Sequence, residues 1–505
     1  MRERFYPELN ISSLEVVQTR PTHYLFIGKT SSGKTVAAEQ LMSILFEKGY
    51  KIVSIYNSWR WESAFMAFPC TESKWQSSMR KRYGLGCYSL PIKIHIPMSN
   101  NLKYIPKDIS EPFTIPLCEM DEYEVSFVGS SNPSIIQVTL MSMALEKMNP
   151  ESTIVDFILE IRKLAKQKTF FIKKIDFPSF FQKSTLKVVL RQISTYLKES
   201  IVSSKECPTS IDLEDILNDT SYISVFAEGL LPPNLRYLTV SYLVRKIFDL
   251  AKEGKIHVPI FLFTDEAEDL IPQETTNPLI MKTRDVYAEM ARGARGANIS
   301  LGIVTQSPLS LYDRVRRQLQ TKFVFLMDNP DELTFLKESH RSLTKEELDM
   351  ISNFTIGDCM IFEMGQQARY IRTIPPPFLH REPKFDFFKL YKKFGGKFES
   401  ALPYLKLVED EIESKIDEYE EFRDNEKKEE KKKERKEVKT TGKKIDTMLD
   451  VLNSFKRINK IQFTIYDIYN SLPNQNQRTL RLWLKKFKEQ GTIKSIKKGS
   501  YELTL

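Results

Sequence analysis

Eight consecutive residues near the start of the chain have the types and spacing of a phosphate-binding loop. They are Gly28, Lys29, Thr30, Ser31, Ser32, Gly33, Lys34 and Thr35, and they match the pattern G-x-x-x-x-G-K-[ST]. The two glycines let the backbone curl until its N–H groups point inward at phosphate oxygens. The pattern predicts that Lys34 reaches the β- and γ-phosphates of ATP and that the Thr35 hydroxyl ligates Mg²⁺.

The elements on either side of this loop are those that it requires. Residues 24–27 form a short apolar run typical of a buried strand, and apolar residues recur at helical spacing after Thr35. A strand that leads through the loop into a helix is the context that separates a working loop from a chance match. We therefore interpret the stretch as a nucleotide-binding site.

A second pair of residues that could take part in catalysis follows an apolar strand at residues 258–264. Asp265 and Glu266 follow that strand directly, which is a Walker B arrangement. We predict that Asp265 holds the Mg²⁺ shell and that Glu266 orients or deprotonates the attacking water. An ordinary acidic turn is the alternative, since Glu268 and Asp269 follow at once. The loop upstream favours the catalytic interpretation, and with it hydrolysis of the nucleotide.

Three further polar residues come from the segment after the Walker B strand. Gln306 lies just after the next predicted strand, residues 299–304, and is our candidate sensor of the γ-phosphate. Arg292 and Arg295 end the helix before that strand and could supply positive charge to a nucleotide in a neighbouring subunit. Taken singly, each arginine has an equally simple interpretation as a surface residue near a helix C-terminus.

The order of these motifs resembles the HerA/FtsK superfamily of P-loop ATPases. The resemblance rests on Gly28–Thr35, on Phe-Leu-Phe-Thr-Asp-Glu-Ala at 261–267, on Ala-Arg-Gly-Ala-Arg-Gly-Ala-Asn at 291–298 and on Val-Thr-Gln-Ser-Pro at 304–308. It implies a RecA-like core, assembly into a hexameric ring, and DNA as the substrate. It departs from HerA in having 27 residues before Gly28, too few for the β-barrel of that protein.

Composition and charge bound the remaining possibilities. The 505 residues are 41% hydrophobic and 28% charged, without an apolar run long enough to span a membrane, so we expect a soluble, cytoplasmic protein. Five scattered cysteines predict free thiols in a reducing compartment. The net charge of +9 is concentrated at the C-terminus, because residues 443–505 hold 13 Lys and Arg against 5 Asp and Glu. That surplus favours a polyanion such as DNA as a partner.

The fold class predicted from these patterns is α/β, a RecA-like P-loop core with a mainly helical insertion and a C-terminal winged helix. The boundaries are 1–132 and 221–383 for the two parts of the core, 133–220 for the insertion, 384–442 for a charged helical linker and 443–505 for the winged helix. Within the insertion, residues 170–181 are expected to be irregular. The third helix of the tail, 475–490, would present basic residues to DNA, together with the wing; the candidates are Arg478, Arg481, Lys485, Lys488, Lys497 and Lys498.

The function that we predict is an ATP-driven DNA translocase that hydrolyses ATP at the subunit interfaces of a homo-hexamer. Loading or anchoring by a protein partner fits the absence of a membrane segment. Two alternatives remain open at this point. One is an ATP-gated DNA-binding regulator that does not translocate, and the other is a protein-remodelling ATPase whose winged helix docks a partner.

Overall fold

The structure of the chain, a computed structural model, describes most of the sequence. The described residues are 22–55, 62–126, 133–166, 169–172, 175–178, 183–340, 343–363, 366–380, 382, 384–417, 419–424, 450–453, 462–464, 467–468, 470, 477–497 and 500–503. They fall into two compact units, residues 1–416 and 417–505. Each unit is considered by itself.

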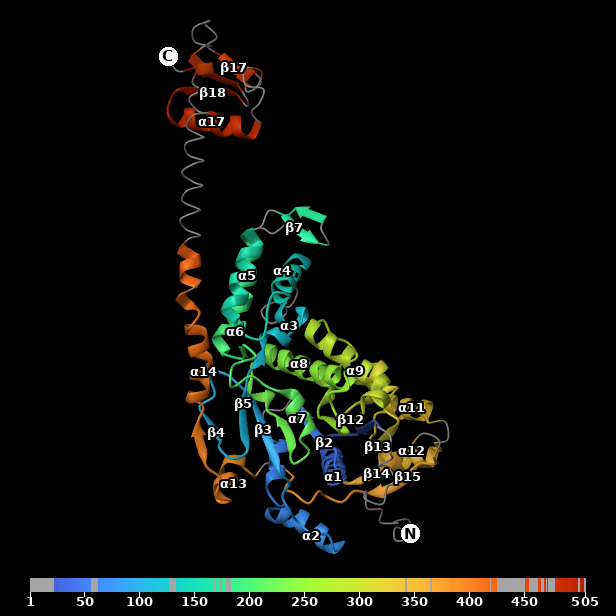
Figure 1. The fold of residues 1–505 in the computed structure, drawn as a ribbon. Helices are drawn as coiled ribbons and strands as arrows, with labels where there is room; N and C mark the ends of the chain where they lie inside the picture. The colour runs from blue at the N-terminus through green and yellow to red at the C-terminus, as the bar shows by residue number, and fades with distance from the viewer. Residues whose placement is uncertain are drawn as a thin grey trace. The chain divides into compact units, whose positions relative to one another are not determined.

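The first unit is organised around one large, mostly parallel sheet (Figure 1). In spatial order its strands are β15 (Arg369–Arg372), β14 (Asp358–Phe362), β13 (Thr321–Val324), β1 (Tyr24–Ile27), β12 (Ile299–Thr305), β11 (Ile260–Thr264), β2 (Lys51–Ile55), β10 (Ile223–Phe226), β3 (Ile92–Pro97) and β5 (Ser110–Phe113). Strands β13 to β5 pair in parallel, whereas β14 and β15 are antiparallel additions at one side. The central strands are apolar runs because both faces of a parallel sheet are covered.

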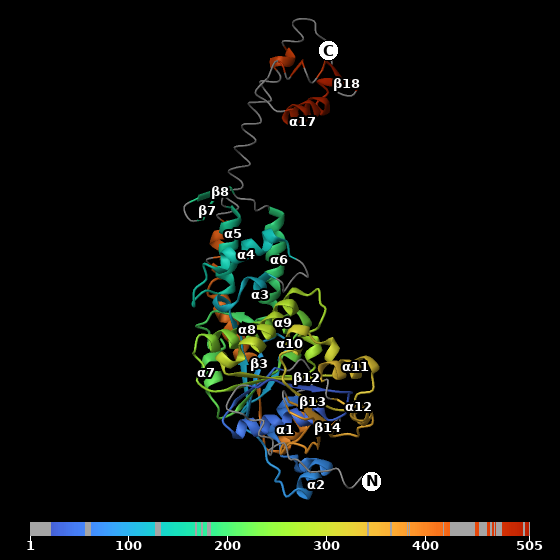
Figure 2. The ribbon, with the colours of Figure 1, turned by 90° about the vertical axis from the view of Figure 1, so that its right-hand side faces the viewer.

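Helices cover both faces of this sheet. Figures 1 and 2 show α1 (Lys34–Glu47) on one face, and α8 (Pro233–Lys252) with α9 (Pro278–Ala297) on the other. The other helices around the core are α2 (Lys74–Arg82), α10 (Asp313–Arg316), α11 (Pro330–Ser339), α12 (Lys345–Ser352), α13 (Phe387–Lys393) and α14 (Leu402–Glu413). The face under α1 is filled by buried aromatic and aliphatic side chains, among them Phe26, Phe261 and Phe323. This is the RecA-like α/β arrangement predicted from the sequence.

The predicted helical insertion is mostly helical. It contains α4 (Ile135–Leu145), α5 (Ile154–Lys166), α6 (Lys183–Glu199) and α7 (Leu213–Asn218), preceded by the short α3 (Glu122–Ser126). The first turn of α4 is fixed by a capping box between Ser134 and Gln137. The prediction of an irregular stretch at 170–181 is wrong in part. Two strands, β7 (Thr169–Ile172) and β8 (Ile175–Pro178), pair there as an antiparallel hairpin.

Buried ion pairs join the base of the insertion to the core. The guanidinium of Arg245, on α8, donates to the fully buried carboxylate of Glu124 at 2.8 Å and lies 3.3 Å from Asp121. Lys282, on α9, also contacts Asp121. Because a buried carboxylate is costly unless it is paired, these contacts fix how α3 sits on α8 and α9.

The aromatic and basic segment after residue 384 packs against the core. Phe387, Leu390 and Tyr391 of α13 belong to the same buried cluster as the central strands. The strand β16 (Phe398–Ser400) pairs antiparallel with β4 (Tyr104–Pro106). The first compact unit therefore reaches Ile416, well into the range that the sequence assigned to a linker.

The described residues of the second unit form a small antiparallel sheet and a helix. The sheet order is β17 (Gln462–Thr464), β19 (Ser500–Leu503), β18 (Ile493–Lys497), and α17 spans Gln477–Glu489. Leu480, Leu484 and Phe487 of the helix share a buried cluster with Leu452, Phe463, Ile468 and Ile493. The helix and hairpin lie where the sequence predicts them, and the assignment of the tail as a winged helix stays a prediction.

Candidate nucleotide-binding site

The phosphate-binding loop joins β1 to α1 and has the backbone conformation that its glycines permit. Gly28 has a φ of 145° and Gly33 a φ of 109°, values that side chains disfavour. A Cβ on Gly28 would lie 2.8 Å from the Cβ of Phe325, so the neighbouring strand leaves no room for one. The sequence pattern and the packing around it thus require glycine at the same place.

Two backbone contacts from later parts of the chain brace the loop. The N–H of Lys29 donates to the carbonyl of Leu326, just past β13, at 2.8 Å. The N–H of Gly357, which precedes β14, donates to the carbonyl of Ser32 at 2.9 Å. Because both partners are fixed by the sheet, the loop is held in its open curve by the main chain.

The side chain of Lys34 folds back into the loop. Its Nζ donates to the carbonyls of Gly28 and Lys29, each at 2.7 Å. Burial lowers the pKa of this ammonium, while the carboxylates of Asp265 and Glu268 partly oppose that shift. Nearby, the hydroxyl oxygen of Ser32 is buried without a hydrogen-bond partner among the described atoms. A cation and an unsatisfied donor in one loop fit a phosphate group, which accepts hydrogen bonds only.

The Walker B pair follows β11, two strands from β1. The hydroxyl of Thr35 donates to Oδ2 of Asp265 at 3.1 Å, and the backbone N–H of Glu266 donates to Oδ1 at 2.8 Å. Glu266 has a φ of 45°, in the left-handed region. A non-glycine residue held there is strained by about 1–3 kcal/mol, and such strain clusters at functional sites. Thr35 and Asp265 are the oxygen donors that would hold Mg²⁺.

Gln306 reaches the same cavity because β12 lies between β1 and β11. Its side-chain oxygen accepts a hydrogen bond from the Thr30 hydroxyl at 3.1 Å. Its backbone N–H donates to Glu268 at 3.3 Å. The predicted sensor therefore bridges the phosphate-binding loop and the acidic turn.

The two arginines lie near the amino ends of the parallel strands, whereas the phosphate-binding loop lies at the carboxyl ends. His23, at the start of β1, contacts the carbonyl of Ala291 through Nε2 at 3.0 Å and accepts from the N–H of Leu301 through Nδ1. Burial lowers the pKa of this histidine to about 4, so it is neutral and donates through Nε2. Arg292, next to Ala291, is exposed at the amino edge of the strands, whereas the loop follows their carboxyl edge. Arg295 lies in α9, and its side chain is outside the described residues.

A cavity of about 370 Å³ at the carboxyl edge collects these side chains and several that the sequence did not indicate. Besides the predicted residues, its lining includes Glu39, Trp75, Glu268, Ile356 and His380. The carboxylate of Glu39, which is 3% exposed, lies 2.8 Å from Nδ1 of His380. These residues are separated by up to 341 positions in the chain, so no local pattern could group them.

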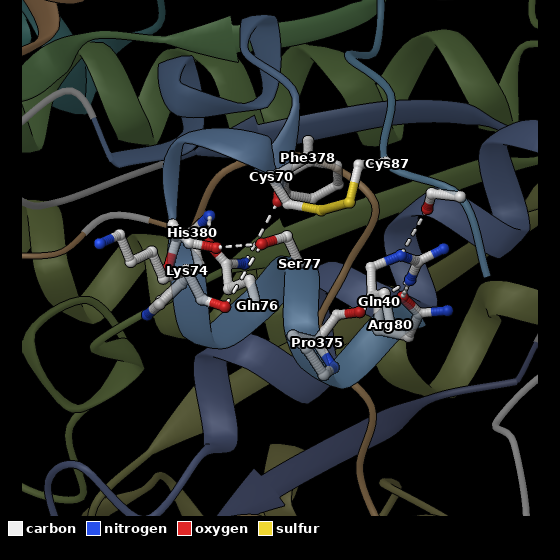
Figure 3. The surroundings of a disulfide bond; sticks show 12 residues. Gln40, Cys70, Lys74, Gln76, Ser77, Arg80, Cys87, Pro375, Phe378 and His380 are labelled. Carbon is white, nitrogen blue, oxygen red and sulfur yellow. Dashed lines mark hydrogen bonds between the residues drawn. A yellow bond between two sulfur atoms is a disulfide. The ribbon is translucent and has the colours of Figure 1, made fainter. Parts of the chain in front are cut away.

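Trp75 of α2 and His380, from the stretch after β15, both line the cavity, and α2 contacts that stretch directly. Arg80 donates to the carbonyl of Pro375 at 2.8 Å, and Gln76 bonds to the main chain at Phe378 and His380. Figure 3 shows these side chains on one side of α2, facing the proline-rich stretch that follows β15. Two carbonyls of this stretch, those of Pro375 and Phe378, thus accept hydrogen bonds from α2.

A disulfide closes the same segment and corrects one prediction. Cys70 and Cys87 are bonded, with their Cα atoms 5.4 Å apart, beside Phe378 (Figure 3). The expectation of free thiols is wrong for this pair, because the chain between the two cysteines folds back through α2. Cys118, Cys207 and Cys359 are free, as expected.

The predicted DNA-binding residues are placed in part. Arg481, Lys485 and Lys488 are exposed on α17. Arg478 lies in α17 and Lys497 in β18, but their side chains are outside the described residues, as is the whole of Lys498. The three exposed residues share the face of the helix away from its buried leucines. No helix in the described part of the chain is long and apolar enough to cross a lipid bilayer.

Comparison with known proteins gives a consistent set of relatives. No family model matches the chain. It is 26% identical over 119 residues to the DNA double-strand break repair helicase HerA of Pyrococcus furiosus, which covers 24% of this chain and 20% of that protein. It is 24% identical over 184 residues to HerA of Sulfurisphaera tokodaii, covering 35% and 34% respectively. The chain thus matches about a fifth to a third of the length of these relatives.

Solved structures with a similar arrangement include VirB4 of Thermoanaerobacter pseudethanolicus, with a TM-score of 0.45 and 12% identity over 72% of this chain and 90% of that one. The plasmid coupling protein TrwB bound to an ATP analogue has a TM-score of 0.44 and 13% identity, over 72% and 88%.

The fold and the cavity define a P-loop nucleotide-binding protein with a RecA-like core. Within that class, the chain is similar to the HerA helicases over part of their length, and the order of its four motifs resembles that of the HerA/FtsK type.

Proposed function

We propose that the protein hydrolyses ATP and uses the energy to translocate along DNA. The observation that carries the proposal is the convergence of Lys34, Thr35, Asp265, Glu266 and Gln306 on one cavity. They come from three strands that are adjacent in the sheet and separated in the sequence, and they supply a phosphate clamp, metal ligands, a base and a sensor.

The roles that we propose follow from the contacts of each side chain. Lys34 exchanges its two carbonyl partners for phosphate oxygens, which are stronger acceptors for an ammonium. Thr35 and Asp265 hold Mg²⁺, which when bound would neutralise charge on the β- and γ-phosphates. Glu266 holds and deprotonates the attacking water, and its fixed backbone sets the direction of its carboxylate.

DNA as the substrate is supported by two separate features. The relatives found by sequence are named as DNA double-strand break repair helicases. The tail carries exposed Arg481, Lys485 and Lys488 on one helix face, which suits the phosphate backbone. We propose that the tail is a winged helix that binds DNA.

A ring of subunits, a hexamer in our proposal, is supported by the place of Arg292. It lies at the amino edge of the strands and cannot contact the cavity of its own subunit. It could complete a neighbour's site if subunits pack with opposite edges together. The protein partner for loading or anchoring, and residence in the cytoplasm, remain parts of the same proposal.

The experiment compares ATP turnover of the full chain without DNA, with single-stranded DNA and with duplex. The mass of the assembled particle is measured in the same buffer. We expect a ring-sized particle whose turnover is stimulated by DNA. Displacement of a third strand from a triplex would then report translocation along the duplex. Turnover that is indifferent to both DNA forms, or binding of DNA without strand displacement, would contradict the motor.

A further inference from the structure

A second surface of the first unit combines exposed aromatic rings with lysines. We call it the aromatic groove and define it by Tyr104, Phe388, Phe398, Lys103, Lys392 and Lys397, which line a depression of about 910 Å³. It is formed by the loop after β3, by β4 and by the segment that contains α13 and β16. None of the residues in this aromatic and basic segment lines the nucleotide site.

The walls of the aromatic groove are fixed by main-chain hydrogen bonds. Strands β4 and β16 pair in antiparallel register, with Tyr104 opposite Ser400. The N–H of Lys107 donates to the carbonyl of Lys397 at 2.9 Å, and the N–H of Ala401 donates to that of Lys103 at 3.0 Å. The two segments are nearly 300 residues apart in the chain, so the groove exists only after folding.

The rings in this groove are exposed to an unusual degree. Tyr104 is 66% exposed and Phe388 is 39% exposed. Phe388 and Phe398 lie with their ring centroids 5.4 Å apart, and Phe398 packs on Tyr391 at 5.3 Å. Phe398 is therefore held by its neighbours, while most of the Tyr104 side chain is accessible to a planar ligand.

The charge around these rings has one sign. Lys103, Lys392 and Lys397 are exposed, and the residues that line the groove include no Asp or Glu. Other lysines of this region are neutralised, as Lys393 is by Glu72 and Lys384 by Glu382. No ion pair involves the three groove lysines within the described part of the chain.

This combination fits one class of ligand. Lysines favour phosphates, and open aromatic faces favour the π-faces of bases, which are accessible in a single strand and hidden in a duplex. Four strands lie between β1 and β3, which puts these two strands roughly 24 Å apart across the sheet. The groove and the nucleotide cavity share no lining residue, so the groove is not part of the ATP site. We infer that the aromatic groove binds single-stranded nucleic acid, with Tyr104 stacking on a base and the lysines contacting the backbone. The inference rests on the proposed function in taking DNA as the polymer that the protein handles.

The first test measures binding of fluorescein-labelled oligo(dT) to the full chain by anisotropy. Tyr104→Ala should weaken binding about tenfold, because it removes one stacking platform, and Tyr104→Phe should keep it, because the ring remains. The double change Lys103→Gln and Lys397→Gln should lower the slope of log affinity against log salt by about 1.4, the value expected for two phosphate contacts on a single strand. Lys337→Gln with Lys345→Gln, the same loss of charge on α11 and α12, should leave both quantities unchanged.

A second readout separates this groove from the C-terminal tail. Oligonucleotides that carry bromodeoxyuridine should crosslink on irradiation to peptides that contain Tyr104 or residues 388–398. Crosslinks confined to residues 443–505, or equal affinity of the Tyr104→Ala and unaltered proteins, would overturn the inference. So would loss of self-association in Tyr104→Ala, which would make the groove a contact between copies of the chain.

ATP turnover and triplex displacement of the same variants keep the two proposals apart. If turnover ignores DNA and no strand is displaced, while oligo(dT) still crosslinks to Tyr104, the motor fails and the groove stands. If the motor works and Tyr104→Ala binds oligo(dT) normally, the groove fails alone.

Discussion

A buried lysine lies at each end of the parallel strands of the main sheet, and the groups around the two lysines differ. At the carboxyl edge, Lys34 donates to the carbonyls of Gly28 and Lys29 and lies beside a cavity with acidic walls. At the amino edge, Lys51 donates to the carbonyls of Asp219 and Tyr222, with its Nζ 3.8 Å from the centre of the Tyr222 ring. Both ammonium groups are capped by two carbonyls, so that feature alone does not mark a binding site.

The difference lies in what can replace the carbonyls. The cap of Lys34 belongs to a glycine loop with an unsatisfied buried hydroxyl at Ser32. Burial lowers the pKa of Lys34, and the carboxylates of Asp265 and Glu268 offset part of that shift. The cap of Lys51 is closed by an aromatic ring, and burial lowers the pKa of Lys51 to about 7. The comparison teaches that a buried cation is a ligand site where its partners can be exchanged, and a structural cost where they cannot.

The largest expected effect comes from Lys34→Met. We expect ATP turnover to be abolished, because nucleotide binding and hydrolysis both need the donor aimed at the phosphates. Phosphate release and thermal unfolding should be measured together, since the fold should be retained. Lys51→Met is the matched control at the other edge, and its turnover should equal that of the unaltered protein. Equal losses in both variants would mean that the two lysines do not differ in role.

Glu266→Gln should reduce hydrolysis by about 10³-fold while ATP binding is retained, because a general base contributes roughly this much to a rate. Binding can be followed with a fluorescent ATP analogue and hydrolysis in a single turnover. Glu268→Gln, in the same cavity, is the control for loss of a carboxylate. If Glu268→Gln is inactive and Glu266→Gln is active, the general base is Glu268 and not Glu266.

Arg292→Ala tests whether the amino edge contributes to catalysis in a neighbour. We expect it to bind ATP and to hydrolyse it about 10³-fold more slowly, as for other arginines that stabilise a transferring phosphoryl group. Mixed with Lys34→Met subunits, it should recover part of its activity, because some interfaces then join an intact loop to an intact arginine. The same mixture with Arg295→Ala shows which arginine is responsible. Absence of recovery in rings that demonstrably contain both subunits would argue against action across an interface.

Lys51→Met should have the smallest effect, visible in the pH dependence of stability. The pKa of Lys51 is lowered from 10.5 in the unfolded chain to about 7 in the fold, so the unfolded state binds more protons between these values. The free energy of unfolding should therefore rise with pH across that window, by up to about 1.4 kcal/mol per pH unit from this group. Urea unfolding at several pH values should show a shallower rise in Lys51→Met. An unchanged slope would mean that the lysine is solvated in the fold.

Much of the nucleotide site could be predicted from the sequence because its parts are short and local. The glycines at 28 and 33 act through their own φ angles, and Asp265 with Glu266 ends an apolar strand that is evident in seven residues. Gln306 was found in the same way, from its place at the end of a strand. These signals depend on backbone conformation within a few residues, and the fold preserves them.

The rest depended on which distant segments meet. Glu39 and His380 pair across most of the chain, Cys70 and Cys87 meet because α2 turns the chain back, and the aromatic groove needs β4 beside β16. The sequence by itself determined the strand ends, the loop conformation and the basic charge of the tail, since each follows from neighbouring residues. Only the tertiary structure decided that Arg292 lies at the opposite end of the strands from its own phosphate-binding loop and that Lys51 is enclosed. The order of the strands in the sheet sets both properties, and the residues beside them do not.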